Sequence, residues 1–545
     1  MEKRYVIGID FGTLSGRAVL VDAANGNELA EGTVGYPHGV MDVALPSGRK
    51  LPPLFALQHP QDYLAVLGAV PRVLADAGVR PEEVAGLGID FTACTMLPVN
   101  EAGVPLCFLP EFADEPHAYV KLWKHHAAQP EADDVNALAS ERKEEWLPIY
   151  GGKISSEWML PKILETLRHA PHVYEKTARF TEAADWLSRM LTGRESHSAA
   201  FAGYKALWNA ETGYPSNDFM AALDPRLCGI VGTKISENVL GVDQIAGALD
   251  GQGSRLTGLP IGTPLALPMI DAHAAMPALN ITGDGDLMII VGTSGCHILN
   301  SAQRKPVDGI SGYVKDGVIP GFYTYEAGQA AVGDIFDWFV KNHVPESYRK
   351  EAVERGVGIH QLLREKAEKL RAGESGLLAL DWLNGNRSVL VNANLTGMML
   401  GLTLQTKPEE EYRAWIEATA FGTRMILEQY EKNGIEIRSV CAAGGIAKKD
   451  GMMMQIYADV TGKEIRIAAS SQAGALGSAI CAATAAGVYP SMQTAAKAMS
   501  GPYIRTYRPI AENQAVYHRL YAEYKTLHDY FGRGGNPVME RLRSI

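Results

Sequence analysis

The chain has 545 residues, with 51 Lys and Arg against 62 Asp and Glu, so its formal net charge is −11. Hydrophobic residues make up 46% and charged residues 21%, as in an ordinary globular protein long enough for two large lobes or several domains. The negative balance argues against a general binder of nucleic acid or of anionic membranes, because such a protein needs a basic surface. A small anionic ligand held by a few local groups remains compatible with it.

The six cysteines are scattered, and no two of them stand at CxxC spacing. We therefore expect neither a structural zinc site nor a disulfide framework. The apolar run at residues 5–9 is too short for the core of a signal peptide. No stretch reaches the roughly 18 uninterrupted apolar residues of a membrane helix. These features predict a soluble, cytoplasmic protein with no membrane or nucleic-acid partner.

Two strand–turn–strand patterns stand about half the chain apart. The first covers residues 5–22, and its turn region carries Asp10, Gly12 and Thr13. The second covers residues 287–299 and has a similar Gly-Thr turn. Because the pattern returns at a spacing much longer than a solenoid repeat, it predicts an internal duplication. Each of the two α/β lobes would begin with the same hairpin.

Helical periodicity separates these hairpins. Apolar residues recur at helical spacing over residues 412–427 and again over residues 516–531. For the second helix, docking on its own lobe is favoured over binding to a partner. Strands that alternate with helices indicate α/β layers. Glycine and proline punctuate residues 258–264, so we divide the chain into an N-terminal lobe, 1–262, and a C-terminal lobe, 263–545.

The glycine-threonine turns are suited to phosphate. Gly12 lets the backbone approach a ligand closely, and Thr13 adds a hydroxyl beside exposed N–H groups. Asp10, at the strand end, can ligate a magnesium ion that bridges such phosphates. One copy alone is more often a plain hairpin with a capping Asp, but two copies favour paired turns that grip a triphosphate. Neither a Walker A sequence nor a convincing GxGxxG after a strand occurs, which disfavours P-loop and Rossmann binding.

Two further segments can carry chemistry. The Gly444-Gly445 pair lies between an expected strand and a helix that starts near Met452, and it leaves room for a flat group such as adenine. Asp271 ends an apolar run just before a helix-like segment. It fits a helix N-cap, which is the favoured interpretation without other observations, or a general base at the junction of the lobes.

Other polar candidates are less distinctive. His125 and His126 cannot both face one metal on a regular helix and lack an evident third ligand, so a metal site there is disfavoured. Trp123 fits the core and a platform for a sugar face equally well. Lys205 and Glu326 are charges inside apolar, aromatic stretches, where they are either paired internally or aimed at a polar ligand. A surface location is at least as compatible with their sequence.

Together these segments resemble the FGGY carbohydrate kinases. The matching stretches stand in the expected order and span nearly the whole chain: residues 8–13, 110–113, 122–124, 150–158, 326–329, 381–382, 418–422, 444–447 and 475–479. The resemblance implies an α/β fold of the duplicated actin-like (ribonuclease H-like) ATPase type, with two lobes around a central cleft. It also implies transfer of the ATP γ-phosphoryl group to the 5-hydroxyl of a pentulose. L-ribulose is the first expectation, and D-ribulose, L-xylulose and D-xylulose are the alternatives.

The resemblance assigns roles residue by residue. Asp271 matches the catalytic base and also lies against the sugar. The positions that match the sugar pocket are Ala93, Lys205 and Glu326, to which we add Trp123 as a platform. The positions that match nucleotide binding are Gly12, Thr13, Arg17, Gly292, Thr293, Ser294, Gly444, Gly445 and Lys448. ATP and Mg²⁺ are the implied cofactors, with Asp10 as the metal ligand.

The sequence departs from the family pattern at one position, and two other classes of protein are alternatives to a kinase. Many FGGY kinases carry an acidic residue where His125 stands, so the sugar contacts of xylulokinase-like members are not carried over. Actins and heat-shock chaperones share the fold but act as ATP-gated switches; Asp271, Lys205 and Glu326 favour the kinase. A dehydrogenase is a remote alternative because the dinucleotide fingerprint is missing. Sugar stereoselectivity and oligomeric state, including a homodimer, are open at this point.

Overall fold

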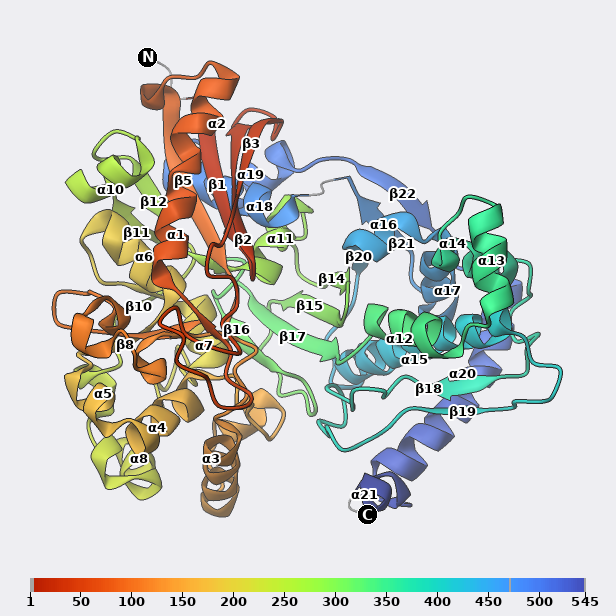
Figure 1. The fold of residues 1–545 in the computed structure, drawn as a ribbon. Helices are drawn as coiled ribbons and strands as arrows, with labels where there is room; N and C mark the ends of the chain where they lie inside the picture. Colours follow the sequence, from red (N-terminus) through yellow and green to blue (C-terminus); the bar gives the residue numbers. More distant parts are fainter. Residues whose placement is uncertain (1–3, 470–471, 544–545) are drawn as a thin grey trace. The chain divides into compact units, whose positions relative to one another are not determined.

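The chain is described by a computed structural model that covers residues 4–469 and 472–543. Its internal contacts divide it into two compact units (Figure 1). Unit 1 comprises Met1–Gly283, Tyr313–Thr324 and Gln472–Gly501; unit 2 comprises Asp284–Gly312, Tyr325–Ser471 and Pro502–Ile545. Unit 1 thus extends past residue 262 and includes two later segments of the chain. A single boundary placed at a glycine- and proline-rich stretch cannot describe a unit made of three segments. The division at 262/263 stays a prediction about family domains.

Unit 1 is built on a seven-stranded mixed sheet of order β11-β12-β5-β1-β2-β3, with β13 also paired to β5. Strands β1 and β2 form the first predicted hairpin, and β1 runs parallel to β5. All eight residues of β5 are buried, as expected for a central parallel strand. The strands are β1 (Tyr5–Phe11), β2 (Ser15–Asp22), β3 (Glu28–Gly35), β5 (Val84–Phe91), β11 (Ile245–Ala248), β12 (Pro264–Ala266) and β13 (Met269–Ile270).

Helix α18 (Ala473–Ala485) packs directly on this sheet. A Cβ added to Gly8 of β1 would lie 1.8 Å from the carbonyl oxygen of Ala475, and one added to Gly88 of β5 would lie 2.0 Å from that of Ser478. Glycine is therefore required at both positions for the helix backbone to approach the strands. Because side chains alternate along a strand, Asp10 and Asp90 face the same side of the sheet as these glycines. Helices α1 (Pro60–Leu67) and α2 (Ala69–Ala77) pack on β2 and β3.

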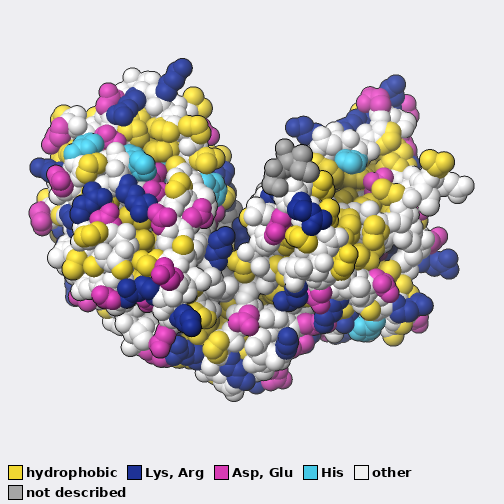
Figure 2. Space-filling model, turned by 90° about the horizontal axis from the view of Figure 1, so that it is seen from below, with side chains coloured by type: hydrophobic (Ala, Val, Ile, Leu, Met, Phe, Trp, Pro, Cys, Tyr) yellow, Lys and Arg dark blue, Asp and Glu magenta, His cyan; other side chains and the backbone are white. Residues whose placement is uncertain are grey.

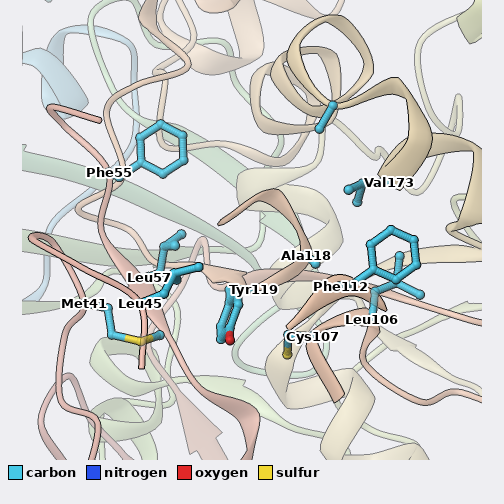
Figure 3. Packing of buried hydrophobic residues seen from close by; sticks show 11 residues of the cluster. Met41, Leu45, Phe55, Leu57, Leu106, Cys107, Phe112, Ala118, Tyr119 and Val173 are labelled. Atoms are coloured by element: carbon cyan, nitrogen blue, oxygen red, sulfur yellow. The ribbon is translucent and has the colours of Figure 1, made fainter. Parts of the chain in front are cut away.

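The rest of unit 1 contains a four-stranded antiparallel sheet of order β4-β7-β6-β8. Beside it, extended segments and α5 enclose a hydrophobic cluster (Figure 3) made of Met41, Leu45, Phe55, Leu57, Leu106, Cys107, Phe112, Ala118, Tyr119, Ala170 and Val173. The elements are β4 (Leu57–Gln58), β6 (Met96–Val99), β7 (Val120–Lys121), β8 (Arg179–Glu182), β9 (His197–Ser198), β10 (Val239–Leu240), α3 (Gln129–Arg142), α4 (Met159–His169), α5 (Pro171–Lys176), α6 (Ala183–Thr192), α7 (Ala199–Lys205), α8 (Asn217–Leu223), α9 (Ile230–Thr233), α10 (Gly251–Thr257), α11 (Asp271–Ala278) and α19 (Met492–Met499).

Unit 2 repeats this sheet topology in the order β17-β15-β14-β20-β21-β22. Across the sheet, the hairpin β14–β15 has the parallel strands β20 and β21 and then the antiparallel edge strand β22 on its β14 side. In unit 1 the hairpin β1–β2 has β5, β12 and the antiparallel edge strand β11 in the same places. The predicted duplication is therefore confirmed as a repeat of strand order. The strands are β14 (Asp286–Val291), β15 (Gly295–Ser301), β17 (Tyr323–Gln329), β20 (Ser439–Ala443), β21 (Ile465–Ala468) and β22 (Tyr503–Tyr507). A further strand, β16 (Gly312–Lys315), has three of its four residues in unit 1.

Both predicted long helices are present in unit 2. Helix α15 (Pro408–Lys432) begins with a proline and three glutamates, which suit a helix N-terminus, and it buries the predicted apolar face. Helix α20 (Ala511–Gly532) docks on its own unit, as favoured. The remaining elements are β18 (Leu378–Leu380), β19 (Met398–Leu400), α12 (Gly333–His343), α13 (Glu346–Glu354), α14 (Ile359–Ala367), α16 (Gly445–Lys449), α17 (Gly451–Thr461) and α21 (Val538–Arg543).

The face of α20 that was predicted to pack on the unit was wrong: a different set of residues on the helix is buried. The buried residues are Tyr517, Tyr521, Tyr524 and His528. The apolar periodicity instead predicts a face made of Val516, Leu520, Tyr524, Leu527 and Phe531, of which only Tyr524 is buried. The tyrosine hydroxyls explain the difference: that of Tyr517 bonds Glu417 at 2.8 Å, and that of Tyr524 bonds Asp381 at 2.9 Å. Buried hydrogen bonds, rather than aliphatic periodicity, orient this helix.

Within the described part of the chain, no helix combines the length and the apolar character that crossing a membrane requires. Acidic and basic side chains are interspersed on the face shown in Figure 2.

Candidate active site

Two aspartates stand side by side in the sheet of unit 1. The parallel register of β1 and β5 pairs Gly8 with Gly88, and Asp10 with Asp90. The two strands carry the same four residues here, Gly-Ile-Asp-Phe, and the Phe rings that follow the aspartates stack with centroids 4.3 Å apart. Since carboxyl ends of parallel strands are where α/β sheets bind ligands, this edge is the natural place for a site.

Asp90 is the buried member of this pair. The hydroxyl of Ser478 in α18 donates to Asp90 Oδ2 at 2.6 Å. Burial and the neighbouring charge of Asp10 hold the pKa of the Asp90 carboxyl well above its usual range, and the charge of Asp271 adds to the shift. The raised pKa reflects the cost of placing a second full negative charge in the buried position beside Asp10.

Asp271 stands at the same edge. It follows β13, whose Ile270 pairs with Phe91 of β5. The N-cap of α11 is Ile270, so the N-cap interpretation of Asp271 is wrong; the aspartate is the first helical residue. Its Oδ1 accepts a hydrogen bond from the N–H of Ala272 at 2.6 Å, which fixes the half-buried carboxylate at the helix start.

The first glycine-threonine turn is tied to Trp123. A hydrogen bond of 3.0 Å from Gly12 N to Ser15 O closes the turn. The indole N–H of Trp123 donates to Thr13 Oγ1 at 3.2 Å, and the Trp123 residue is 37% exposed. Trp123 is therefore a partly exposed residue beside the turn and not a core residue. Arg17, opposite Asp10 in the hairpin, donates to the side chains of Thr33 and Gln472, among other partners.

Lys205 lies beside the turn that carries Ala93. Its buried ammonium is 5.8 Å from the ring centroid of Trp158 and 5.9 Å from that of Tyr204, so aromatic faces surround it. Burial raises the pKa of Glu182 to about 7, and the nearby charges of Lys162 and, more weakly, Lys205 oppose that rise. Because Glu182 accepts a 2.8 Å bond from the Thr95 N–H, Glu182 and Lys205 both flank the segment at residues 92–95.

His125 points into the interior of unit 1. Its Nε2 lies 2.9 Å from Glu165 Oε2, and its ring packs edge-on against Phe55. Burial lowers its pKa to about 4. His125 is therefore a structural residue of the interior of unit 1.

The second glycine-threonine turn, in unit 2, leads to a helix start. Gly292 N donates to Ser294 O at 3.0 Å. The turn's carbonyl groups accept from the N-terminal residues of α12: Val332 N donates to Thr293 O at 2.8 Å, and Gly333 N to Gly292 O at 2.9 Å. The start of α12 therefore fixes the backbone of this turn through two hydrogen bonds.

The Gly-Gly turn packs against this hairpin. Gly444 has φ +100°, and a Cβ there would lie 2.4 Å from the carbonyl oxygen of Val291, the residue before Gly292. Gly445 has no atom within 4 Å of a Cβ position, so open space lies beside it. The Lys448 ammonium donates to Ala469 O at 2.8 Å. Unit 2 thus brings two of the predicted nucleotide segments together, residues 292–294 and 444–448.

Glu326 is half-buried in β17 of unit 2, whereas Ala93, Trp123, Lys205 and Asp271 belong to unit 1. That Glu326 joins them around one sugar, and that the two glycine-threonine turns face each other across a cleft, stay predictions.

The carboxylates suit magnesium that arrives with a nucleotide. Among the described residues, no three His, Cys, Asp or Glu side chains form a group fit to hold a metal ion. Mg²⁺ typically uses one or two carboxylates together with phosphates and water. Half-buried Asp10 can supply such a hard oxygen ligand, so the residues fit a phosphate-bound ion.

Sequence reasoning missed Asp90 and Ser478. A signal for Asp90 was present, because residues 88–91 repeat the Gly-Ile-Asp-Phe of residues 8–11 and parallel strands bring such repeats into register. Ser478 lies in the 475–479 stretch that supported the family resemblance, but its contact with Asp90 depends on tertiary packing.

Comparison with solved structures identifies the class of fold. Xylulose kinase from Rhodospirillum rubrum superposes with a TM-score of 0.79 at 23% identity, over 96% of this chain and 98% of that one. The fold is the two-domain actin-like ATPase fold of sugar kinases, as predicted.

Sequence comparison then gives the family. The profile of the C-terminal domain of the FGGY family of carbohydrate kinases matches residues 287–486. Ribulokinase of Halalkalibacterium halodurans is 52% identical over 100% of this chain and 98% of its own, and ribulokinase of Mycolicibacterium smegmatis is 49% identical over 99% and 96%. The chain belongs to the FGGY family of carbohydrate kinases.

Proposed function

We propose that this protein transfers the γ-phosphoryl group of ATP to the 5-hydroxyl of L-ribulose, giving L-ribulose 5-phosphate and ADP, in L-arabinose catabolism. The choice of sugar is supported by full-length similarity, at 52% identity, to a protein named ribulokinase. The choice of chemistry is supported by one geometric observation: Asp271 stands at the same sheet edge as Asp10 and Asp90. We place the reaction in the cytoplasm, with the sugar and ATP as substrates.

Asp271 acts as the general base in this proposal. Its carboxylate accepts the proton of the 5-hydroxyl while the sugar oxygen bonds to the γ-phosphorus and the bond from that phosphorus to the ADP oxygen breaks. General-base help of this kind contributes about 10²–10⁴-fold. Phosphoryl transfer otherwise depends on positioning and electrostatic stabilisation.

The sugar residues of unit 1 have distinct tasks. The buried Lys205 ammonium would donate to sugar hydroxyls near Ala93, and the exposed indole of Trp123 would cover one face of the sugar. Burial makes such charged hydrogen bonds strong, because water is excluded from them. Glu326 would accept from a further hydroxyl.

Nucleotide binding uses the glycine turns. Gly12 and Gly292 would let phosphate approach the backbone closely, and the backbone N–H groups of Thr13, Thr293 and Ser294, with Arg17, would bind phosphate oxygens. The open space beside Gly445 would take the adenine, next to Lys448. Asp10 would hold Mg²⁺, whose charge offsets that of the phosphates.

The nearest rival is a kinase for another pentulose. We therefore expect that, with ATP and Mg²⁺, kcat/KM for L-ribulose exceeds that for D-ribulose, L-xylulose and D-xylulose by at least about tenfold, since one misplaced hydroxyl leaves buried polar groups unpaired. A panel of the four sugars measured with the same enzyme preparation tests this. A higher kcat/KM for any of the other three would refute L-ribulose as the substrate.

A further inference from the structure

Lys162 of α4 is a fully buried lysine whose ammonium donates to three main-chain oxygens. Its Nζ donates to Cys94 O at 2.6 Å, to Leu122 O at 2.9 Å and to Lys121 O at 3.2 Å. An ammonium has three N–H donors, so these bonds use all of them.

The carbonyl groups belong to two segments that are far apart in sequence. Cys94 follows Ala93 in the turn after β5, and its φ of +56° is a left-handed conformation that a non-glycine residue adopts only when its surroundings hold it. Leu122 directly follows β7 and precedes Trp123. One ammonium therefore ties the turn of one proposed sugar residue to the strand end of another.

The same turn is fixed from other sides as well. The Thr95 hydroxyl bonds Thr92 O at 2.9 Å and Ala93 O at 3.1 Å, and Glu182 accepts from the Thr95 N–H. The N-cap of helix α4 is Trp158, whose aromatic ring Lys205 faces. The helix thus contributes to the surroundings of Ala93, Trp123 and Lys205.

A neighbouring lysine shows what an ordinary structural ion pair would look like. Lys121, equally buried, lies 2.5 Å from Glu165 Oε2. Among the ion pairs of the described residues, none within 4.0 Å involves Lys162. Burying a charge without a close counter-ion is costly, and burial lowers the pKa of Lys162. The close polar contacts of this ammonium are therefore its bonds to the two segments.

We propose that Lys162 is a positioning residue, which fixes the Ala93 turn and the Trp123 strand end relative to each other and so sets the affinity for the polyhydroxylated sugar. The inference rests on the proposed function, because that proposal supplies the roles of Ala93 and Trp123. It assigns Lys162 no contact with the sugar or with the nucleotide.

The test compares K162M with K121M, a matched removal of a neighbouring buried ammonium. We expect K162M to raise the KM for the sugar at least about tenfold, with the KM for ATP changed by less than about twofold. K121M should lower the unfolding temperature at least as much, because it leaves Glu165 without its ion pair, and yet raise the sugar KM less than about threefold. Equal sugar KM values for the two variants, or a parallel rise in the KM for ATP, would overturn the proposal.

A second variant covers the case in which K162M does not fold. K162Q keeps an amide donor of two N–H groups, so it should fold more readily and raise the sugar KM about three- to tenfold. A sugar KM within about twofold of the unmodified enzyme in folded K162Q would also overturn the proposal. The sugar used is the best substrate of the unmodified enzyme. If L-ribulose is not the substrate, the sugar panel shows it with the unmodified enzyme, whatever the variants do. If Lys162 does not position the sugar site, only the KM values of the variants show it.

Discussion

Asp271→Asn is expected to lower kcat for L-ribulose at least about 100-fold, because an amide cannot accept the proton of the 5-hydroxyl. The fold should be unaffected, since the Asn side-chain oxygen can still accept the 2.6 Å bond from Ala272 N at the start of α11. Steady-state kinetics with saturating ATP and Mg²⁺ measures the loss, and thermal unfolding checks the fold.

A matched control is Asp218→Asn, which also removes a carboxylate from the first turn of a unit 1 helix, α8. It should leave kcat within about twofold. If Asp271→Asn retained near-normal turnover, Asp271 would not be the base.

Gly445→Val is expected to weaken ATP binding at least about 30-fold, because its side chain would fill the open space that we assign to the adenine. Gly445 is exposed at the start of α16, and a Cβ there meets no atom within 4 Å, so the substitution should not disturb the fold. Isothermal titration with ATP measures the change in Kd.

Gly358→Val provides the comparison. Gly358 precedes α14 in the same unit, with φ −70° and nothing within 4 Å of its Cβ position. This variant should bind ATP as the unmodified chain does. If Gly445→Val also left the Kd for ATP unchanged, the adenine would lie elsewhere.

The duplication was predictable because it rests on local signals. The paired Gly-Thr turns and the alternation of strands and helices reflect backbone requirements that nearby residues express, and the sheets of both units follow them. The unit boundary was less predictable. Unit 1 includes α18, whose close approach to Gly8 and Gly88 is visible only once the strands pair.

The candidate site divides in the same way. Asp10, Gly12 and Thr13 are local to one turn, so their proximity could be predicted from sequence. The bond from Trp123 to Thr13, and the carbonyl groups held by Lys162, join residues that are distant in the chain. Lysine at position 162 has no sequence feature that separates it from an exposed helical lysine.

The measurement of ADP release with and without L-ribulose tests most directly whether this protein transfers phosphate to the sugar. We expect ADP formation in the presence of Mg²⁺ and ATP to rise at least about 100-fold when L-ribulose is added. The sugar product should carry its phosphate on O5 by NMR. ADP release that no pentulose changes would contradict the claim and favour an ATP-gated switch protein.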